Sequence, residues 1–228
     1  MSELGATAKA AFKAAWPVIL AYVGIGLPCG IMESEIGYTW WMAFVMSMTF
    51  YSGAGQFMIP SMWLSGSSIP SIIASVSFVN TRQMLYSTAF SPYFDKVRKL
   101  LTFVFAATVT DESFGVNLIE YQHGNWSAGK ATLVNIFCMT SWGVCNALGV
   151  LIGDALSIPT AIAAFAMTSI FICLLMDQEM NRMNLVVIAA TILGVFFFKL
   201  VGLTGPAIFL GALVGLGAGM AYRQVGAR

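Results

Sequence analysis

Three charged residues lie well inside apolar stretches of the sequence: Arg82, Asp111 and Glu112. An arginine at the centre of a bilayer costs at least about 2.5–3.5 kcal/mol to insert, so it normally faces other helices and has a partner. Because adjacent helical residues point about 100° apart, we expect one acid to pair with Arg82 and the other to face a cavity and titrate. The alternatives are a permanent structural ion pair, or acids that lie at the end of a span.

Small and polar residues interrupt two apolar stretches, and they predict broken helices near residues 51–56 and 80–83. The first stretch contains Gly53 and Gly55 with Pro60 close behind, and the second contains Asn80-Thr81-Arg82-Gln83. Glycine and proline are poor material for a continuous helix. The alternative is that the glycines only allow helices to pack closely.

Irregular backbone at membrane depth survives only where protein or a water-filled cavity satisfies its polar groups. Transporters use such breaks to aim the amino termini of half-helices at an anionic group of the substrate. A substrate-binding site is therefore expected at the two breaks and the acidic pair. Its candidate residues are Gly53, Gly55, Gln56, Asn80, Arg82, Asp111 and Glu112.

The composition requires lipid as the solvent for most of these 228 residues. Hydrophobic residues make up 58% and charged residues 9%, and the mean hydropathy is +0.82. Soluble domains are about half apolar and a quarter charged, and a membrane-spanning helix needs about 20 apolar residues. We predict an all-α, polytopic integral membrane protein with about seven to eight transmembrane helices. The apolar segments are 16–32, 40–64, 69–90, 100–119, 131–152, 160–176, 185–201 and 206–222.

No linker divides the chain, so residues 1–228 are predicted to form a single transmembrane domain in the inner or plasma membrane. The positive-inside rule places the short segment 1–15 in the cytoplasm, and the basic carboxy terminus on the same side. Eight simple crossings would then put the basic loop at residues 95–99 outside. Either this loop violates the rule, or residues 40–90 do not cross as two ordinary helices.

Three glycines spaced by four, Gly211, Gly215 and Gly219, lie on one helical face. Such a seam of small residues is predicted to pack against a helix, either within the chain or from a partner. The four cysteines have neither CxxC spacing nor neighbouring histidines, so no disulfide framework, metal site or cofactor is expected.

Two classes of function are excluded on composition and motifs. The net charge is only +1, without a basic stripe, so no partner nucleic acid is expected. The single histidine, His123, lies in a polar connector, and no HExxH or GxSxG motif occurs, so we do not expect an enzyme. A channel or a structural membrane subunit for another small solute stays open as the alternative to a transporter.

Three ordered motifs resemble the AzlC-type family, the large subunits of branched-chain amino acid exporters. They are Tyr51-Ser52-Gly53-Ala54-Gly55-Gln56-Phe57, Asn80-Thr81-Arg82-Gln83-Met84-Leu85-Tyr86 and Thr110-Asp111-Glu112. The resemblance implies secondary export of valine, leucine, isoleucine or methionine together with a small hydrophobic AzlD-type membrane subunit. Members commonly have histidine after the arginine, whereas this chain has Gln83, which does not titrate near neutral pH. Proton coupling is therefore expected at Asp111 or Glu112.

The mechanism that we expect places a zwitterionic amino acid between the two breaks. Its carboxylate would lie near the backbone N–H groups around Gly55 and near Arg82, and its ammonium near Asp111 or Glu112. Phe57, Met58 and Tyr86 would either form the wall of an apolar pocket or belong to the ordinary core.

Overall fold

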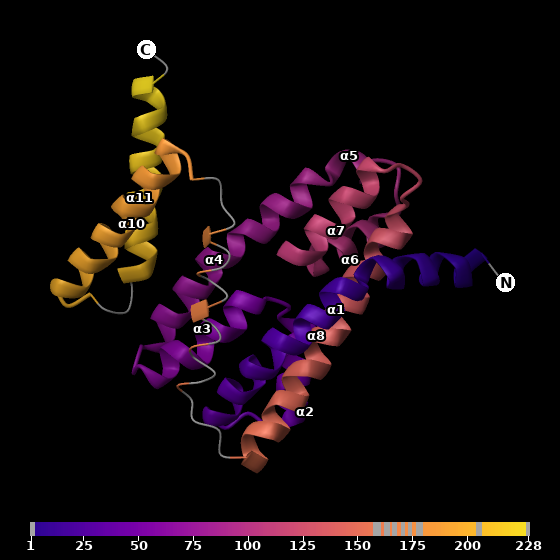
Figure 1. Ribbon diagram of the computed structural model, residues 1–228, viewed down its shortest axis with the longest axis horizontal. Coiled ribbons are helices and arrows are strands. Elements are labelled where there is room, and N and C mark those ends of the chain that lie inside the picture. The colour runs from indigo at the N-terminus through magenta and orange to yellow at the C-terminus, as the bar shows by residue number, and fades with distance from the viewer. Residues whose placement is uncertain are drawn as a thin grey trace.

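The computed structural model describes residues 3–156, 180–203 and 207–226, with isolated residues between 157 and 179. Helices and short connections make up these residues, and no strand occurs among them, which confirms the all-α prediction. The helices are α1 (Glu3–Glu35), α2 (Trp40–Thr49), α3 (Gly53–Leu64), α4 (Ile69–Ala89), α5 (Ser91–Phe94), α6 (Lys99–Thr108), α7 (Asp111–Gln122), α8 (Ala128–Leu156), α10 (Arg182–Leu200) and α11 (Ala207–Gly226) (Figure 1). The predicted segment 160–176 lies outside the continuously described residues.

Within the described residues, α1, α8 and α10 are long and apolar enough to cross a membrane. The expected number of seven to eight crossing helices is not confirmed. Two of the expected spans, 40–64 and 100–119, are each divided into two short helices.

α1 and α8 form a parallel pair that organises the first 156 residues. The rings of Phe12 and Phe137 lie 5.4 Å apart near the start of both helices. Further along, a Cβ added to Gly30 would collide with the backbone of α8 at Gly149. The glycines therefore let the two backbones approach closely, as in other membrane helix pairs.

α2 and α3 fold back on each other as a hairpin, here called the first hairpin. The side-chain amide of Gln56 donates to the Ser47 hydroxyl at 2.9 Å. In one continuous helix these residues would be about 13.5 Å apart along the axis, so the chain must reverse between Thr49 and Gly53. The break falls at residues 50–52, at the start of the predicted interval 51–56.

α6 and α7 form a second hairpin, which the sequence analysis did not predict. Asn135 of α8 donates to the carbonyl of Phe105 in α6 and accepts from Asn117 in α7. Residues twelve apart in one helix would be separated by about 18 Å, so α7 must return alongside α6. The turn consists of Val109 and Thr110, both in extended conformation.

The two hairpins enter from opposite ends of the α1–α8 pair. α7 contacts the first turns of α8, where Asn117 donates to the Ala131 carbonyl, whereas α3 contacts the last turns of α1 through Gln56 and Glu33. α4 runs between the two ends, beside α3 at its start and leading to α5 (Figure 1). The loop at 95–99 therefore lies on the same side as the amino terminus, which satisfies the positive-inside rule.

The predicted break at residues 80–83 is wrong, because α4 is continuous from Ile69 to Ala89. This stretch contains neither glycine nor proline, and its polar side chains make their bonds without opening the helix. The Thr81 hydroxyl, for example, donates to the Phe78 carbonyl one turn earlier.

α10 and α11 form a separate antiparallel pair beside α4 (Figure 1). A Cβ on Gly211, Gly215 or Gly219 would meet Val195, Thr191 or Val187 of α10, respectively. The face of α11 that bears the three glycines thus packs on a neighbour within the chain.

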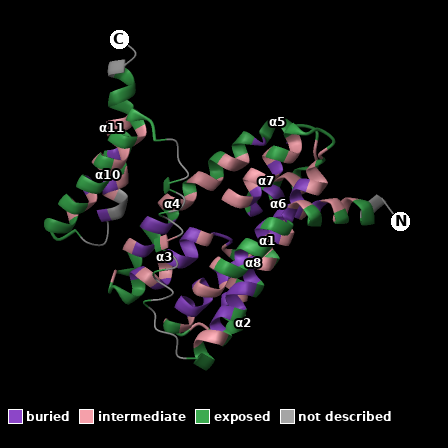
Figure 2. Ribbon diagram, in the orientation of Figure 1, coloured by how far each residue is buried: buried purple, intermediate pink, exposed green. Residues whose placement is uncertain are grey.

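Buried residues concentrate where α1, α3 and α8 meet, whereas large apolar side chains cover the outer surfaces (Figure 2). Leu85 is 71% exposed, and Leu100 is 75% exposed. A bilayer solvates apolar side chains on the outer surface, so their exposure is expected of an integral membrane protein.

Membrane-impermeant maleimide labelling of Lys13→Cys, Ser68→Cys and Lys96→Cys tests this topology. The first and third positions should label from one side and Ser68→Cys from the other, because the first hairpin returns to the side that it came from. The cysteines at 29, 138 and 145 are buried, and Cys173 is replaced by serine in every variant, so that the Cys173→Ser chain serves as the blank. Eight simple crossings would instead place Lys13→Cys and Ser68→Cys together and Lys96→Cys opposite.

Candidate functional site

Arg82 and Asp111 form the one ion pair found in the described part of the chain. Nη2 of Arg82 lies 2.8 Å from Oδ2 of Asp111, and the two side chains are 33% and 27% exposed. Arg82 Nε and Asp111 Oδ1 are buried and have no hydrogen-bond partner among the described residues. The pair therefore leaves one donor and one acceptor without a partner among the described residues.

Tyr22 of α1 joins the tips of the two hairpins. Its hydroxyl lies 2.9 Å from the hydroxyl of Tyr51 and donates to Glu112 Oε2 at 3.0 Å. Tyr22 is only 2% exposed. The two turns, which are far apart in sequence, therefore meet at one tyrosine about midway along α1.

The start of α3 is fixed by polar side chains from α4. Ser52 accepts from the Gly55 backbone N–H at 3.1 Å and donates to Asn80 Oδ1 at 2.5 Å. Gln83 donates to the Tyr51 carbonyl at 3.1 Å. Asn80 and Gln83 thus provide hydrogen-bond partners for residues 51 and 52 at the first break, and they do not form a second break in α4. The candidates Gly53, Gly55 and Asn80 lie here, whereas Arg82 is paired with Asp111 of α7.

The start of α7 has its own cap. Thr110 and Ser113 form a reciprocal capping box, in which the Ser113 hydroxyl also accepts from the Thr110 N–H at 3.0 Å. Asp111 and Glu112 lie in the first turn. Carboxylates are stabilised at this position, because the amino end of a helix carries partial positive charge.

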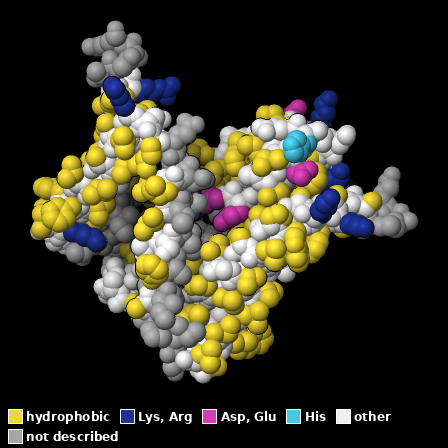
Figure 3. All heavy atoms as spheres, viewed as in Figure 1, with side chains coloured by type: hydrophobic (Ala, Val, Ile, Leu, Met, Phe, Trp, Pro, Cys, Tyr) yellow, Lys and Arg dark blue, Asp and Glu magenta, His cyan; other side chains and the backbone are white. Residues whose placement is uncertain are grey.

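The two amino termini differ in a way that suits a zwitterion. α3 has no acidic residue in its first turn, whereas α7 has two. The amino end of α3 can accept an anion, and the acids of α7, beside which Arg82 lies, can accept a cation. Acidic side chains are visible in a hollow within a mostly apolar face, with Lys and Arg near its edges (Figure 3).

Gln56 lies one turn into α3 and is 1% exposed. Its Oε1 accepts from the Trp142 indole at 2.7 Å, and its Nε2 donates to Ser47 and, at 3.1 Å, to Glu33 Oε1. Both amide hydrogens are therefore used within the protein. These contacts make Gln56 a residue that holds α3 against α1, α2 and α8.

Glu33 directly follows the predicted apolar segment 16–32, a position typical of a connector, whereas the structure buries it at 1% exposure. Sequence reasoning also missed Tyr22, Tyr51 and Ser52 as residues that organise the site. A hydroxyl before Gly53 and another before Asp111 could have identified both turns, since serine and threonine favour helix amino caps.

The three expected apolar wall residues lie in different places. Phe57 packs against Trp142 with ring centroids 6.4 Å apart, and Met58 belongs to a buried cluster with Met62, Ile72 and Val76. Tyr86 packs on Phe114 at 4.7 Å, one turn beyond Asp111. The burial of Phe57 and Met58 favours ordinary core, whereas Tyr86 lies beside the acids.

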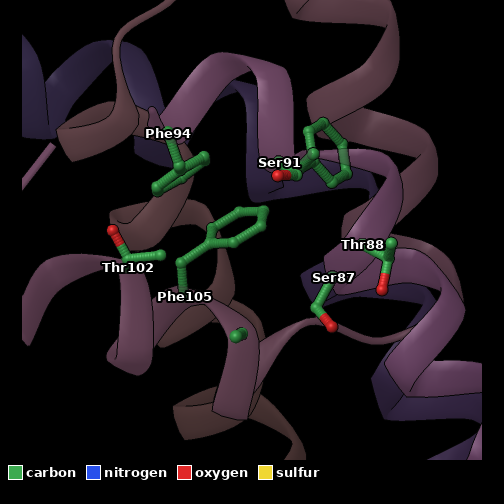
Figure 4. Close-up of a pocket in the computed structure, with 8 residues that line it drawn as sticks. Ser87, Thr88, Ser91, Phe94, Thr102 and Phe105 are labelled. Atoms are coloured by element: carbon green, nitrogen blue, oxygen red, sulfur yellow. The ribbon is translucent and has the colours of Figure 1, made fainter. Parts of the chain in front are cut away.

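A pocket of about 280 Å³ opens between α4, α5 and α6, away from the predicted site residues. The rings of Phe94 and Phe105 face each other on one side, and Ser87, Thr88 and Ser91 lie on the other (Figure 4). It lies toward the side of the amino terminus, because α5 joins α4 to the second hairpin there.

Comparison with known proteins gives one family match and several relatives. The family described as AzlC protein matches residues 17–156. An uncharacterised membrane protein of Helicobacter pylori is 27% identical over 85% of this chain and 90% of its own length. The inner membrane protein YgaZ of Escherichia coli is 25% identical over 79% of this chain and 76% of its own. The branched-chain amino acid transport protein AzlC of Bacillus subtilis is 24% identical over 79% and 71%.

No solved structure matches the chain. The membrane fold and the relatives define a helical membrane transporter. Since the family match covers more than half of the sequence, the chain belongs to the AzlC family.

Replacing Ser52 by alanine should destabilise the amino end of α3. Loss of such a cap costs about 1 kcal/mol, and the bond to Asn80 is lost as well, so the thermal unfolding temperature of the purified protein should fall. Ser68→Ala is the matched control, because Ser68 precedes α4 without a side-chain cap bond. Equal unfolding temperatures for the two variants would contradict this function of Ser52.

Proposed function

We propose that the chain is a secondary transporter that exports branched-chain or other neutral hydrophobic amino acids, namely valine, leucine, isoleucine or methionine. The observation that supports it most is the pair of helix starts that meet at Tyr22: the start of α3 has no acid, and the start of α7 carries Asp111 and Glu112 with Arg82 paired to Asp111. The name of the Bacillus subtilis relative adds support for the class of substrate.

The substrate carboxylate binds at the first turn of α3, around Gly53 and Gly55, and at Arg82 Nε. The two N–H groups at the start of α3, at Gly53 and Ala54, precede the first intrahelical bonds and point toward the break. The substrate ammonium binds at Asp111 Oδ1 or at Glu112. Asn80 orients Ser52 at the break, and Gln56 positions α3. Tyr86, beside the acids, contributes to the apolar wall.

Protons are coupled to transport through Asp111 or Glu112. Protonation of either acid removes the negative charge that holds the ammonium and weakens substrate binding. The Tyr22 hydroxyl bonded to Glu112 also reaches Tyr51, so a change at the acid is transmitted to the tip of the first hairpin.

A small hydrophobic AzlD-type subunit completes the transporter. Apolar side chains on the outer face of α4 are compatible with either lipid or such a subunit; Met84 is 68% exposed and Leu85 is 71% exposed. The partner is proposed from the family resemblance.

Counterflow of radiolabelled valine, leucine and methionine into proteoliposomes tests the substrate class, with and without the co-expressed small subunit. We expect saturable uptake that an imposed pH gradient accelerates. Flux without saturation would indicate a channel, and no uptake of any amino acid by folded protein would overturn the substrate assignment.

Arg82→Ala and Asp111→Asn should lower the initial rate of counterflow by at least about tenfold, equivalent to about 1.4 kcal/mol. Each variant removes one charge that the bound amino acid needs. Arg182→Ala and Asp154→Asn are controls with the same chemical changes at exposed positions and should retain the wild-type rate. Wild-type rates for correctly inserted Arg82→Ala and Asp111→Asn would show that the binding site lies elsewhere.

A further inference from the structure

Glu33 is a buried carboxyl that the proposed site does not use. It lies in the last turn of α1 and is 1% exposed. Oε1 accepts from Gln56 at 3.1 Å, whereas Oε2 is buried without a partner among the described residues. A carboxylate in this position would keep half of its hydrogen-bonding capacity unsatisfied in the protein interior, which is costly.

Within the described part of the chain, no Lys or Arg forms an ion pair with Glu33. The ion pair found there joins Arg82 and Asp111. The groups that face Glu33 are neutral at pH 7: Cys29 and Tyr38 beside it, Ser47 of α2, and Gln56 of α3, whose amide is held by Trp142 of α8. The nearby carboxylates Glu35 and Asp154 are exposed.

The electrostatic setting also disfavours negative charge on Glu33. The carboxyl end of a helix carries partial negative charge, and Glu33 lies at that end of α1. Asp111 and Glu112 have the reverse setting, because they lie at a helix amino end and are bonded to Arg82 and Tyr22. The protein therefore contains two kinds of acidic site, one built for a carboxylate and one for a neutral carboxylic acid.

We propose that Glu33 is a second proton-binding site, separate from Asp111 and Glu112, which is protonated when the first hairpin packs on α1 and deprotonated when water enters between them. In the second state the Oε2–H bond breaks, its electron pair stays on the carboxylate, and the proton passes to water. The reverse transfer closes the hairpin.

The location of Glu33 sets the side from which its proton comes. It is two residues from the exposed Glu35, at the end of α1 opposite the basic segments 1–15 and 95–99. The positive-inside rule assigns that end to the outside of the cell. When Glu33 takes up a proton there, the change in its hydrogen bond to Gln56 affects the position of α3. The first turn of α3 is half of the proposed amino acid site. This coupling function rests on the proposed transport function, whereas the protonation of Glu33 does not.

Infrared spectroscopy of the full-length protein in lipid tests the protonation directly. At neutral pH the wild type should show a carboxylic acid C=O band that Glu33→Gln lacks. Glu35→Gln, which removes an exposed carboxyl two residues away, should retain the band. Glu33→Gln keeps an oxygen that can accept from Gln56, and its unfolding temperature verifies the fold. Identical carboxylic acid bands in the wild type and folded Glu33→Gln would overturn the proposal.

The same variants in proteoliposomes test the coupling. Glu33→Gln should retain counterflow at equal pH, but its uptake driven by a pH gradient should be at least about tenfold slower than that of the wild type. Glu35→Gln and Glu33→Asp should keep the gradient response. Gradient-driven uptake at the wild-type level in Glu33→Gln would overturn coupling through Glu33. If the wild type transports no amino acid, the proposed function fails, and the infrared band still decides whether Glu33 is protonated.

Discussion

The whole arrangement depends on one constraint: backbone that leaves the helical conformation inside a bilayer must find hydrogen-bond partners within the protein. The chain does so twice, at residues 50–52 and 109–110. Ser52 and Thr110 cap the helices that follow, and Gln83 satisfies the Tyr51 carbonyl. Because both turns have partners at about the same depth, two helix amino termini can face a common region that carries Arg82, Asp111 and Glu112.

The α1–α8 pair makes this arrangement possible. It holds the two helices parallel, so that one hairpin enters from each end and their tips meet at Tyr22. The same geometry places every Lys and Arg of segments 1–15 and 95–99 on one side. For residues 3–156, the topology and the placement of these basic segments therefore agree with the positive-inside rule.

Composition and segment lengths predicted the membrane class and the helical fold, because they depend only on how much apolar surface lipid must cover. Gly53 and Gly55 predicted the first turn, because glycine disfavours a continuous helix. The second turn was missed because Val109 and Thr110 look like ordinary apolar helix, and the break at 80–83 was predicted wrongly because polar side chains were taken for irregular backbone. Tertiary partners such as Asn135, which lies 18 or more residues away from Phe105, Thr108 and Asn117, are not visible in local sequence.

Buried charge identified Arg82, Asp111 and Glu112 from sequence, because lipid makes isolated charge so costly. The same reasoning passed over Glu33, which stands at the end of an apolar segment and is buried only because the first hairpin folds over it. The fold determines which acids lie near a helix amino end and which near a carboxyl end. Asp111 and Glu112 lie where the helix favours negative charge, and Glu33 lies where the helix disfavours it.

The central claim is that the amino end of α3 and Arg82 receive a carboxylate. Competition against radiolabelled valine counterflow by unlabelled valine and by valinamide, in which an uncharged amide replaces the carboxylate, tests it most directly. Charge-assisted hydrogen bonds are worth about 1.5–3 kcal/mol, so valinamide should compete at least about tenfold less well than valine. Equal competition by the two compounds would contradict the account.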